Sequence, residues 1–279
     1  MSLVKHITNY VFKHPSRSNS AAMSVSKFKE PYLTDSDSVD GYSLLTVKKA
    51  DSSNGHFYFM HGGGYTLEPI GAHRTIMLRL VNLGYKVTYI DYPLCPEYTA
   101  EKTNSVSLAG YIKLTEKYPD DTFYFIGDSS GGGLAVSLLM QLRDAGFEKR
   151  PAKTVLLSPW LDVTEENEQI PEYEKRDSSL SAVLLKTTGE KYAGSLGPEH
   201  PFVSPLYGHL DNLGSLLLFF SETEIMYPDC MKFIDLANTA KGTQTSSFVE
   251  KKASHDFLMY AKKDKLDAYY SAIQSFIQN

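Results

Sequence analysis

The sequence predicts an α/β fold in which helices cover both faces of a mostly parallel central sheet. Three observations support this prediction: short apolar segments rich in Tyr, Phe, Val and Ile recur along the chain, helix-period stretches separate them, and 279 residues suffice for one large core. Strands that alternate with helices form right-handed βαβ units. The strands should therefore run parallel, with helices on both sides of the sheet.

The expected elements follow one another in chain order from residue 56, strand alternating with helix. The strands are expected at His56–Met60, Lys86–Asp91, Thr122–Ile126, Thr154–Leu157, Ser215–Phe220 and Thr245–Val249. The helices are expected at Ala72–Leu83, Glu101–Tyr118, Gly132–Ala145, Asp229–Thr239 and Lys263–Ile277. No internal repeat divides the sequence, so we expect a single domain over residues 1–279.

Two segments fall outside this alternation. Residues 1–40 combine a helix-like start with a polar, serine-rich run, and we expect them to precede the sheet. Residues 162–200 form a long, initially acidic connection between two strands, and such connections inside a compact domain are usually functional. We expect the two segments to form a small helical cap over a site. The alternative is a pair of solvated surface excursions.

Composition and charge exclude several classes of function. The chain is 42% hydrophobic with a net charge of -5, and it lacks the basic stripe with interleaved aromatic residues that would bind nucleic acid. Cys95 and Cys230 stand far apart, so both are expected to be reduced, and no metal or other cofactor is expected. The longest apolar run, Leu216–Phe220, is too short to cross a bilayer, and polar residues interrupt any signal peptide. We therefore expect a cytoplasmic location.

A candidate nucleophile follows the strand that ends at Ile126. The segment Gly127–Gly131 has the pattern G-x-S-x-G, in which a strand turns sharply into a helix and projects a serine hydroxyl above the sheet edge. Starting the pattern one residue later would place Asp128 where the first glycine must stand, so Ser129 and not Ser130 is the candidate. The pattern is short, and by itself it is a weak signal.

A more specific signal is His61-Gly62-Gly63-Gly64, which follows the strand His56–Met60. Successive glycines leave backbone N–H groups unobstructed, and such donors can bind the negative oxygen of a tetrahedral intermediate. We assign this oxyanion hole to the N–H groups of Gly63 and Gly64, together with that of Ser130 at the start of the following helix.

A serine hydroxyl needs a base, and an imidazole with a pKa near 6.5 can serve as one. In folds with such an elbow the order along the chain is nucleophile, acid, base, and His255 is the one histidine that follows residue 209. The acid should lie between them, after the strand Ser215–Phe220. Glu224 is our choice there, with Asp229 second and Glu222 third, because Asp229 is well explained as a helix start.

From about residue 55 to the C-terminus, the sequence resembles those of the hormone-sensitive-lipase-like group of α/β-hydrolase esterases. The matching segments are His61–Gly64, Asp91–Glu97, Gly127–Gly132 and Ser158–Asp162. The resemblance implies the α/β-hydrolase fold, roles for these segments as oxyanion loop, structural turn, elbow and entry to a cap, and a structural role for His61. It also favours Glu224 as the acid.

Three residues depart from the family pattern. Pro93 and Cys95 replace Arg and Ala in the structural turn, and Ser130 replaces Ala after the nucleophile. These changes leave the backbone donors intact, so we expect the chemistry to persist. The inherited side-chain contacts of that turn are not expected.

The sequence therefore predicts a serine carboxylesterase that hydrolyses short- to medium-chain acyl esters through an acyl-enzyme intermediate. Its expected partner is a small-molecule ester, and a homodimer is left open. Two alternatives stay open as well. One is a catalytically weak small-molecule binding protein of the same fold, and the other is a peptidase or amidase.

Overall fold

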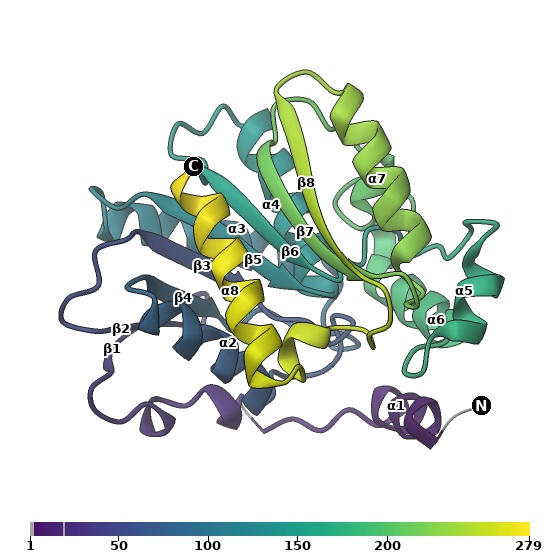
Figure 1. Ribbon diagram of the computed structural model, residues 1–279, viewed down its shortest axis with the longest axis horizontal. Coiled ribbons are helices and arrows are strands. Elements are labelled where there is room, and N and C mark those ends of the chain that lie inside the picture. The colour runs from purple at the N-terminus through teal and green to yellow at the C-terminus, as the bar shows by residue number, and fades with distance from the viewer. Residues whose placement is uncertain (1–2, 19) are drawn as a thin grey trace.

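The computed structural model describes residues 3–18 and 20–279, so residues 1, 2 and 19 of the expected cap segment 1–40 lie outside the described residues (Figure 1). Within the described chain, eight strands form one sheet in the order β1-β2-β4-β3-β5-β6-β7-β8. Their bounds are β1 Leu33–Val39, β2 Tyr42–Lys48, β3 His56–Met60, β4 Lys86–Ile90, β5 Phe123–Asp128, β6 Lys153–Leu157, β7 Gly214–Ser221 and β8 Thr243–Glu250.

Parallel pairing runs from β4 through β3 and β5 to β8, whereas β2 pairs antiparallel with both β1 and β4. Each strand from β3 to β8 lies within two residues of its expected position. The predicted α/β class with a mostly parallel sheet is confirmed.

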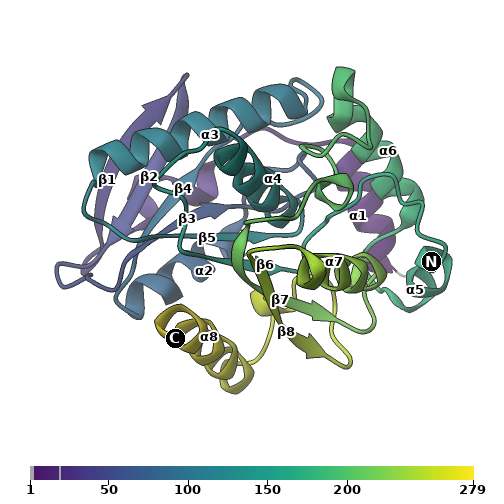
Figure 2. The same ribbon diagram turned by 90° about the horizontal axis from the view of Figure 1, so that it is seen from above.

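The helices lie in two layers, one on each face of the sheet. Figure 2 shows α2 (Gly71–Asn82) and α8 (Lys263–Gln278) on one face, and α3 (Ala100–Lys117) and α4 (Ser130–Asp144) on the other, where α7 (Tyr227–Thr239) also packs. Successive residues of a strand point to opposite faces. In β3, Tyr58 and Met60 accordingly join the core under α3 and α4, and Phe57 and Phe59 join the core under α2 and α8.

The expectation that residues 1–40 precede the sheet is wrong for residues 33–39, which form the edge strand β1. This strand reads Leu-Thr-Asp-Ser-Asp-Ser-Val and has no fully buried residue, so it lacks the apolar signal of the inner strands. Asp40 and Gly41 connect it to β2, both with positive φ, as a two-residue hairpin of type I′ requires. The Asp-Gly pair of this turn is the sequence signal from which the hairpin could have been predicted.

The remaining helices gather at one end of the molecule (Figure 1). They are α1 (Leu3–Lys13), α5 (Ile170–Arg176) and α6 (Ala182–Ala193); α6 contacts both α1 and α5. Single 3-10 turns occur at Ala21–Met23, Val25–Lys27, Gly194–Leu196, Pro205–Tyr207 and Phe257–Met259. No helix in the described part of the chain has the length and apolar character needed to span a membrane.

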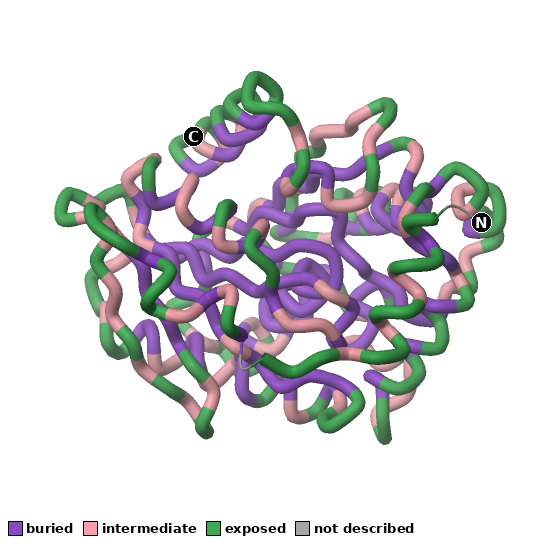
Figure 3. Tube along the Cα trace, turned by 90° about the horizontal axis from the view of Figure 1, so that it is seen from below, coloured by how far each residue is buried: buried purple, intermediate pink, exposed green. Residues whose placement is uncertain are grey.

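The parallel strands end at one edge of the sheet, and the loops after β3, β5, β7 and β8 meet there. This is where ligands usually bind in α/β sheets. Figure 3 shows that the interior of the trace is buried, with exposed residues mainly on the outer loops and helix surfaces. The fold therefore brings the loops after these four strands together at one edge of the buried sheet.

Candidate active site

Ser129 occupies the sharp turn between β5 and α4. Its backbone has φ 50° and ψ -120°, an unfavourable conformation for a residue with a side chain. Backbone hydrogen bonds hold it: its N–H donates to the Leu157 carbonyl at 2.8 Å, and its carbonyl accepts from the N–H groups of Trp160 at 2.9 Å and of Gly132 at 3.0 Å. Such a strained turn at a strand end exposes the side chain of its central residue.

The glycines around Ser129 are required by close backbone approach. A Cβ atom on Gly131 would lie 2.1 Å from the Met60 carbonyl oxygen, and one on Gly127 would lie 2.3 Å from the Gly131 carbonyl oxygen. Neither backbone oxygen can move aside without disturbing β3 or α4. The G-x-S-x-G pattern therefore corresponds to the tight turn that the sequence predicts.

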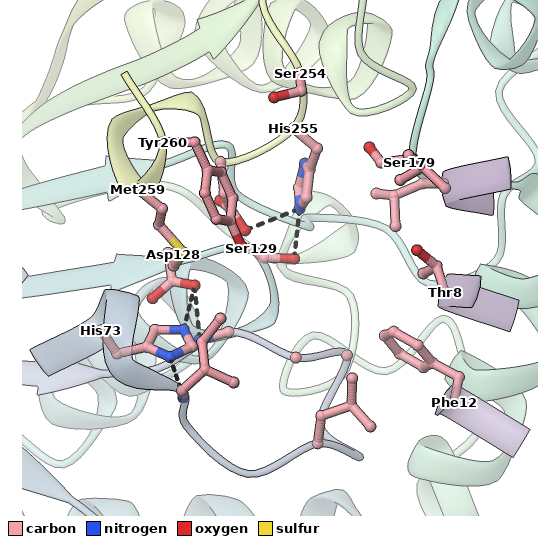
Figure 4. A pocket seen from close by; sticks show the side chains of 18 of the residues that line it. Thr8, Phe12, His73, Asp128, Ser129, Ser179, Ser254, His255, Met259 and Tyr260 are labelled. Carbon is pink, nitrogen blue, oxygen red and sulfur yellow. Dashed lines mark hydrogen bonds and ion pairs between the residues drawn. The ribbon is translucent and has the colours of Figure 1, made fainter. Parts of the chain in front are cut away.

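The structure brings Ser129, His255 and Glu224 together, although they lie after three different strands; Figure 4 shows the contact of Ser129 with His255. Nε2 of His255 is 2.9 Å from Oγ of Ser129, and its Nδ1 is 2.8 Å from Oε2 of Glu224. The other carboxylate oxygen of Glu224 accepts the Ser221 N–H at 2.8 Å. An imidazole that donates its Nδ1–H to Glu224 has Nε2 free to accept the Ser129 proton.

The two competing acids do not reach His255. Asp229 lies in the first turn of α7 and accepts a hydrogen bond from the Asn167 side chain at 2.7 Å, while Glu222 is exposed to solvent. Burial raises the pKa of Asp229 to about 6, partly offset by the Asn167 hydrogen bond. Among the three carboxylates weighed from the sequence, Glu224 alone has its carboxylate hydrogen-bonded to the imidazole.

The expected oxyanion donors lie beside Ser129. Within residues 3–18 and 20–279, no protein group accepts the N–H of Gly63 or of Gly64, and Ser130 is the first residue of α4, where N–H groups lack an intrahelical acceptor. The Ser130 hydroxyl accepts the Tyr65 N–H at 3.1 Å and so ties the glycine loop to the elbow. The serine that replaces the family alanine thus has a structural partner.

Asp256 is a neighbour of the site that sequence reasoning missed. Its Oδ2 lies 3.3 Å from Nε2 of His255, and its Oδ1 is buried without a hydrogen-bond partner in the described structure. Burial alone would lower the pKa of His255, but the charge of Asp256 and the hydrogen bond to Glu224 outweigh burial and raise it to about 10. The adjacent pair His255-Asp256 in the sequence was the available signal.

A second pair that sequence reasoning missed lies on the other side of Ser129. Oδ2 of Asp128 accepts the Gly62 N–H at 2.9 Å and lies 3.2 Å from Nε2 of His73. His73 also accepts the Ile70 N–H through Nδ1 at 2.8 Å. This pair holds the glycine loop against the elbow.

His61 differs from both of these histidines in its surroundings. Burial lowers the pKa of His61 to about 3, and its Nδ1 contacts the Gly62 carbonyl.

A cavity of about 450 Å³ opens over Ser129 and His255. Figure 4 shows Thr8 and Phe12 of α1 on one side of it, and Met259 and Tyr260 on another. The other apolar lining residues are Val4, Leu67, Ile70, Leu180 and Leu185. The cavity therefore suits a mainly apolar small molecule.

No group of three or more His, Cys, Asp or Glu side chains in the described residues is arranged to hold a metal ion.

The chain is similar to known proteins of one family. Residues 57–259 match the family described as the alpha/beta hydrolase fold. The chain is 32% identical to an acetyl-hydrolase of Streptomyces hygroscopicus over 66% of its length, and 29% identical to an esterase of Acinetobacter venetianus over 70%. These matches span 62% and 65% of the two relatives, less than two thirds of their length.

A solved structure is similar over nearly the whole chain. It is an esterase of the bacterial hormone-sensitive lipase family, with a TM-score of 0.82 and 25% sequence identity, and the match covers 98% of this chain and 95% of that one. The agreement extends well beyond the strands that carry the site.

Proposed function

The chain belongs to the α/β-hydrolase family, and we propose that it is a serine carboxylesterase that works through an acyl-enzyme intermediate. The resemblance to hormone-sensitive-lipase-like esterases, expected from four sequence segments, is confirmed by the family match and by the structural likeness. The observation that carries the proposal is the continuous contact from Ser129 Oγ through His255 to Glu224.

In the proposed reaction, Oγ of Ser129 attacks the ester carbonyl carbon while Nε2 of His255 takes the hydroxyl proton. Glu224 holds the Nδ1–H and stabilises the imidazolium that forms. The carbonyl oxygen becomes negative and is bound by the N–H groups of Gly63, Gly64 and Ser130. His255 then protonates the departing alcohol. In the second half of the reaction, water attacks the acyl-enzyme with His255 as the base, and the acid is released from Ser129.

We also propose that α1 and the segment 162–200 form a cap over this site. Val4, Thr8 and Phe12 of α1 line the cavity, as do Leu180 and Leu185 of the insertion. A cavity of about 450 Å³ accommodates a short or medium acyl chain better than a long one. Faster hydrolysis of the C12 than of the C4 nitrophenyl ester would contradict this size limit.

The decisive experiment is labelling of the full chain with a fluorophosphonate, followed by mapping of the modified peptide. We expect the label on Ser129, and we expect Ser129→Ala to lower p-nitrophenyl acetate hydrolysis by at least about 10⁴-fold. Ser247→Ala, at an exposed serine of β8, is the matched control and should keep full activity. Unchanged hydrolysis by Ser129→Ala would reject the proposed nucleophile.

A further inference from the structure

The first helix of the chain, α1, exposes an apolar side to solvent and packs its other side against the protein. Lys5, Thr8, Asn9 and Phe12 of α1 are the residues turned toward the body of the protein, and the Lys5 ammonium donates to the Glu174 carbonyl at 2.6 Å. The opposite side is apolar and exposed, although a helix at a protein surface normally buries its apolar side. This exposed side needs a physical explanation.

The apolar side of α1 is continuous and follows the helical period. Its residues are Leu3, Val4, Ile7, Tyr10 and Val11, with exposed fractions of 75%, 52%, 54%, 63% and 40%. We call these five residues the α1 face. Their spacing of three and four residues places them on one side of a helix, so they form a single stripe.

The charge of the N-terminal segment is the opposite of that of the whole protein. Residues 1–29 contain Lys5, Lys13, Arg17, Lys27 and Lys29 and no Asp or Glu, in a chain whose net charge is -5. Lys13, Lys27 and Lys29 are exposed, whereas Arg17 pairs with Glu97 at 2.7 Å. Lys27 and Lys29 belong to the segment that packs near α2, at the other end of the molecule from α1 (Figure 1), so Lys13 is the exposed lysine of the helix itself. An apolar helix face with an exposed lysine and no acidic residue on the same helix suits the interface of an anionic membrane.

We propose that the α1 face docks on an anionic lipid surface. The helix would lie in the plane of the surface, with its apolar side chains among the lipids and Lys13 near the headgroups. Val4 belongs both to the α1 face and to the cavity lining, and Thr8 and Phe12 of the same helix face the cavity (Figure 4). The cavity mouth would therefore lie next to the lipid, where an apolar ester is concentrated; this last step rests on the proposed esterase function.

A second copy of the chain fits the α1 face less well. Pairing two such faces would bring two segments without acidic residues together, and like charges repel. An eleven-residue helix is only about 16 Å long, and one stripe of it offers much less than the roughly 800 Å² per partner of a stable interface. A lipid surface needs no matching shape and supplies the negative charge.

The test is binding of the full chain to vesicles made of ether-linked lipids, which an esterase does not hydrolyse. We expect co-sedimentation with vesicles of phosphatidylcholine and phosphatidylglycerol, weaker binding to phosphatidylcholine alone, and a decrease as salt is raised. The double variant Ile7→Ser and Val11→Ser should lower binding by about tenfold or more, because two buried apolar side chains are lost. Lys13→Glu should lower it by a smaller factor.

Matched controls separate docking from general surface effects. Leu236→Ser changes a residue of α7 that is 43% exposed, and Lys241→Glu changes an exposed lysine after that helix; both should bind vesicles like the unmodified chain. Ile7 and Val11 do not line the cavity, so their double variant should hydrolyse dissolved p-nitrophenyl acetate at the normal rate. That rate also shows that the variant is folded.

Three results would overturn the proposal: no preference for anionic vesicles, equal binding by the double variant, or a dimer in solution that the double variant dissociates while vesicles are not bound. The last result would assign the α1 face to contact between two copies. Because vesicle binding is measured without turnover, it stays informative even if Ser129→Ala is found to be fully active. Failure of docking and failure of the esterase proposal are thus separate outcomes.

Discussion

Two histidine–carboxylate pairs flank Ser129, and they are built in opposite ways. In the pair His73–Asp128, both partners are tied to backbone N–H groups, those of Ile70 and Gly62. In the pair His255–Glu224, the carboxylate is also tied to backbone, but Nε2 of the imidazole faces Oγ of Ser129 at 2.9 Å. Both histidines line the same cavity.

The difference lies in which nitrogen remains available. His73 accepts a hydrogen bond through Nδ1, so its Nε2 carries the proton and points to Asp128. His255 donates through Nδ1, so its Nε2 can accept a proton. A buried histidine beside an acid is therefore not sufficient for base catalysis. The tautomer that the neighbours impose decides whether it can act as a base.

The largest expected effect comes from exchanging the acid of each pair for its amide. Glu224→Gln removes the charge that stabilises the imidazolium and disturbs its tautomer, so kcat should fall by about 10³- to 10⁴-fold. Asp128→Asn keeps an oxygen for the Gly62 N–H, so kcat should fall by no more than about tenfold. Steady-state hydrolysis of p-nitrophenyl acetate measures both. Equal losses in the two variants would contradict the assignment of one catalytic and one structural pair.

The inner sheet and the elbow were predictable because burial leaves a local signal. Strands β3 to β7 are short, mainly apolar segments, and the glycines around Ser129 are dictated by close backbone contacts. The choice of His255 and Glu224 needed only their order along the chain. Whether the three residues act as proposed stays a prediction that the mutants test.

The parts that were missed depend on contacts that sequence periodicity does not record. The edge strand β1 is polar because its outer side faces water. Asp256 reaches His255 because its own backbone has φ 54°, a conformation that turns the chain sharply after the histidine. His73 contacts Asp128, 55 residues further along the chain. Contacts of this kind depend on the tertiary fold, so they cannot be predicted from the periodicity of the sequence.

An intermediate effect is expected from Asp256, which is a second carboxylate beside His255, whereas among residues 3–18 and 20–279 only the Asp128 carboxylate pairs with His73. The negative charge of Asp256 favours the imidazolium form of His255 and so raises the pKa of that imidazole, while burial raises the pKa of the Asp256 carboxyl itself. Asp256→Asn lowers this pKa. We therefore expect the acid side of the kcat/KM profile to move to lower pH by at least about one unit.

Asp256→Asn is compatible with the positive φ at this position, and it retains the backbone N–H that donates to the Ser158 hydroxyl at 3.2 Å. Asp264→Asn, at an exposed position in the first turn of α8, is the control and should leave the profile in place. A profile for Asp256→Asn that overlays that of the unmodified chain would show that Asp256 does not influence the base.

The smallest effect on activity is expected at Asp229, a buried acid that pairs with Asn167 and, in the described part of the chain, with no histidine. Burial raises its pKa from 3.8 to about 6, so the folded state binds the proton more tightly than the unfolded state. Its contribution to the free energy of unfolding is then greatest below about pH 4 and is lost as the pH rises through about 6. At about pH 8 the buried charge costs about 3 kcal/mol relative to the protonated acid.

Asp229→Asn removes that charge and keeps an oxygen to accept the Asn167 hydrogen bond. Denaturant unfolding should show a gain of about 1–2 kcal/mol at about pH 8 and little change at about pH 4, with kcat/KM within about twofold of the original value. A large loss of activity would instead assign the catalytic acid to Asp229. Because Asp229 has a raised pKa without contacting His255, the result also tests whether contact with the imidazole, and not a perturbed pKa, identifies the functional carboxylate.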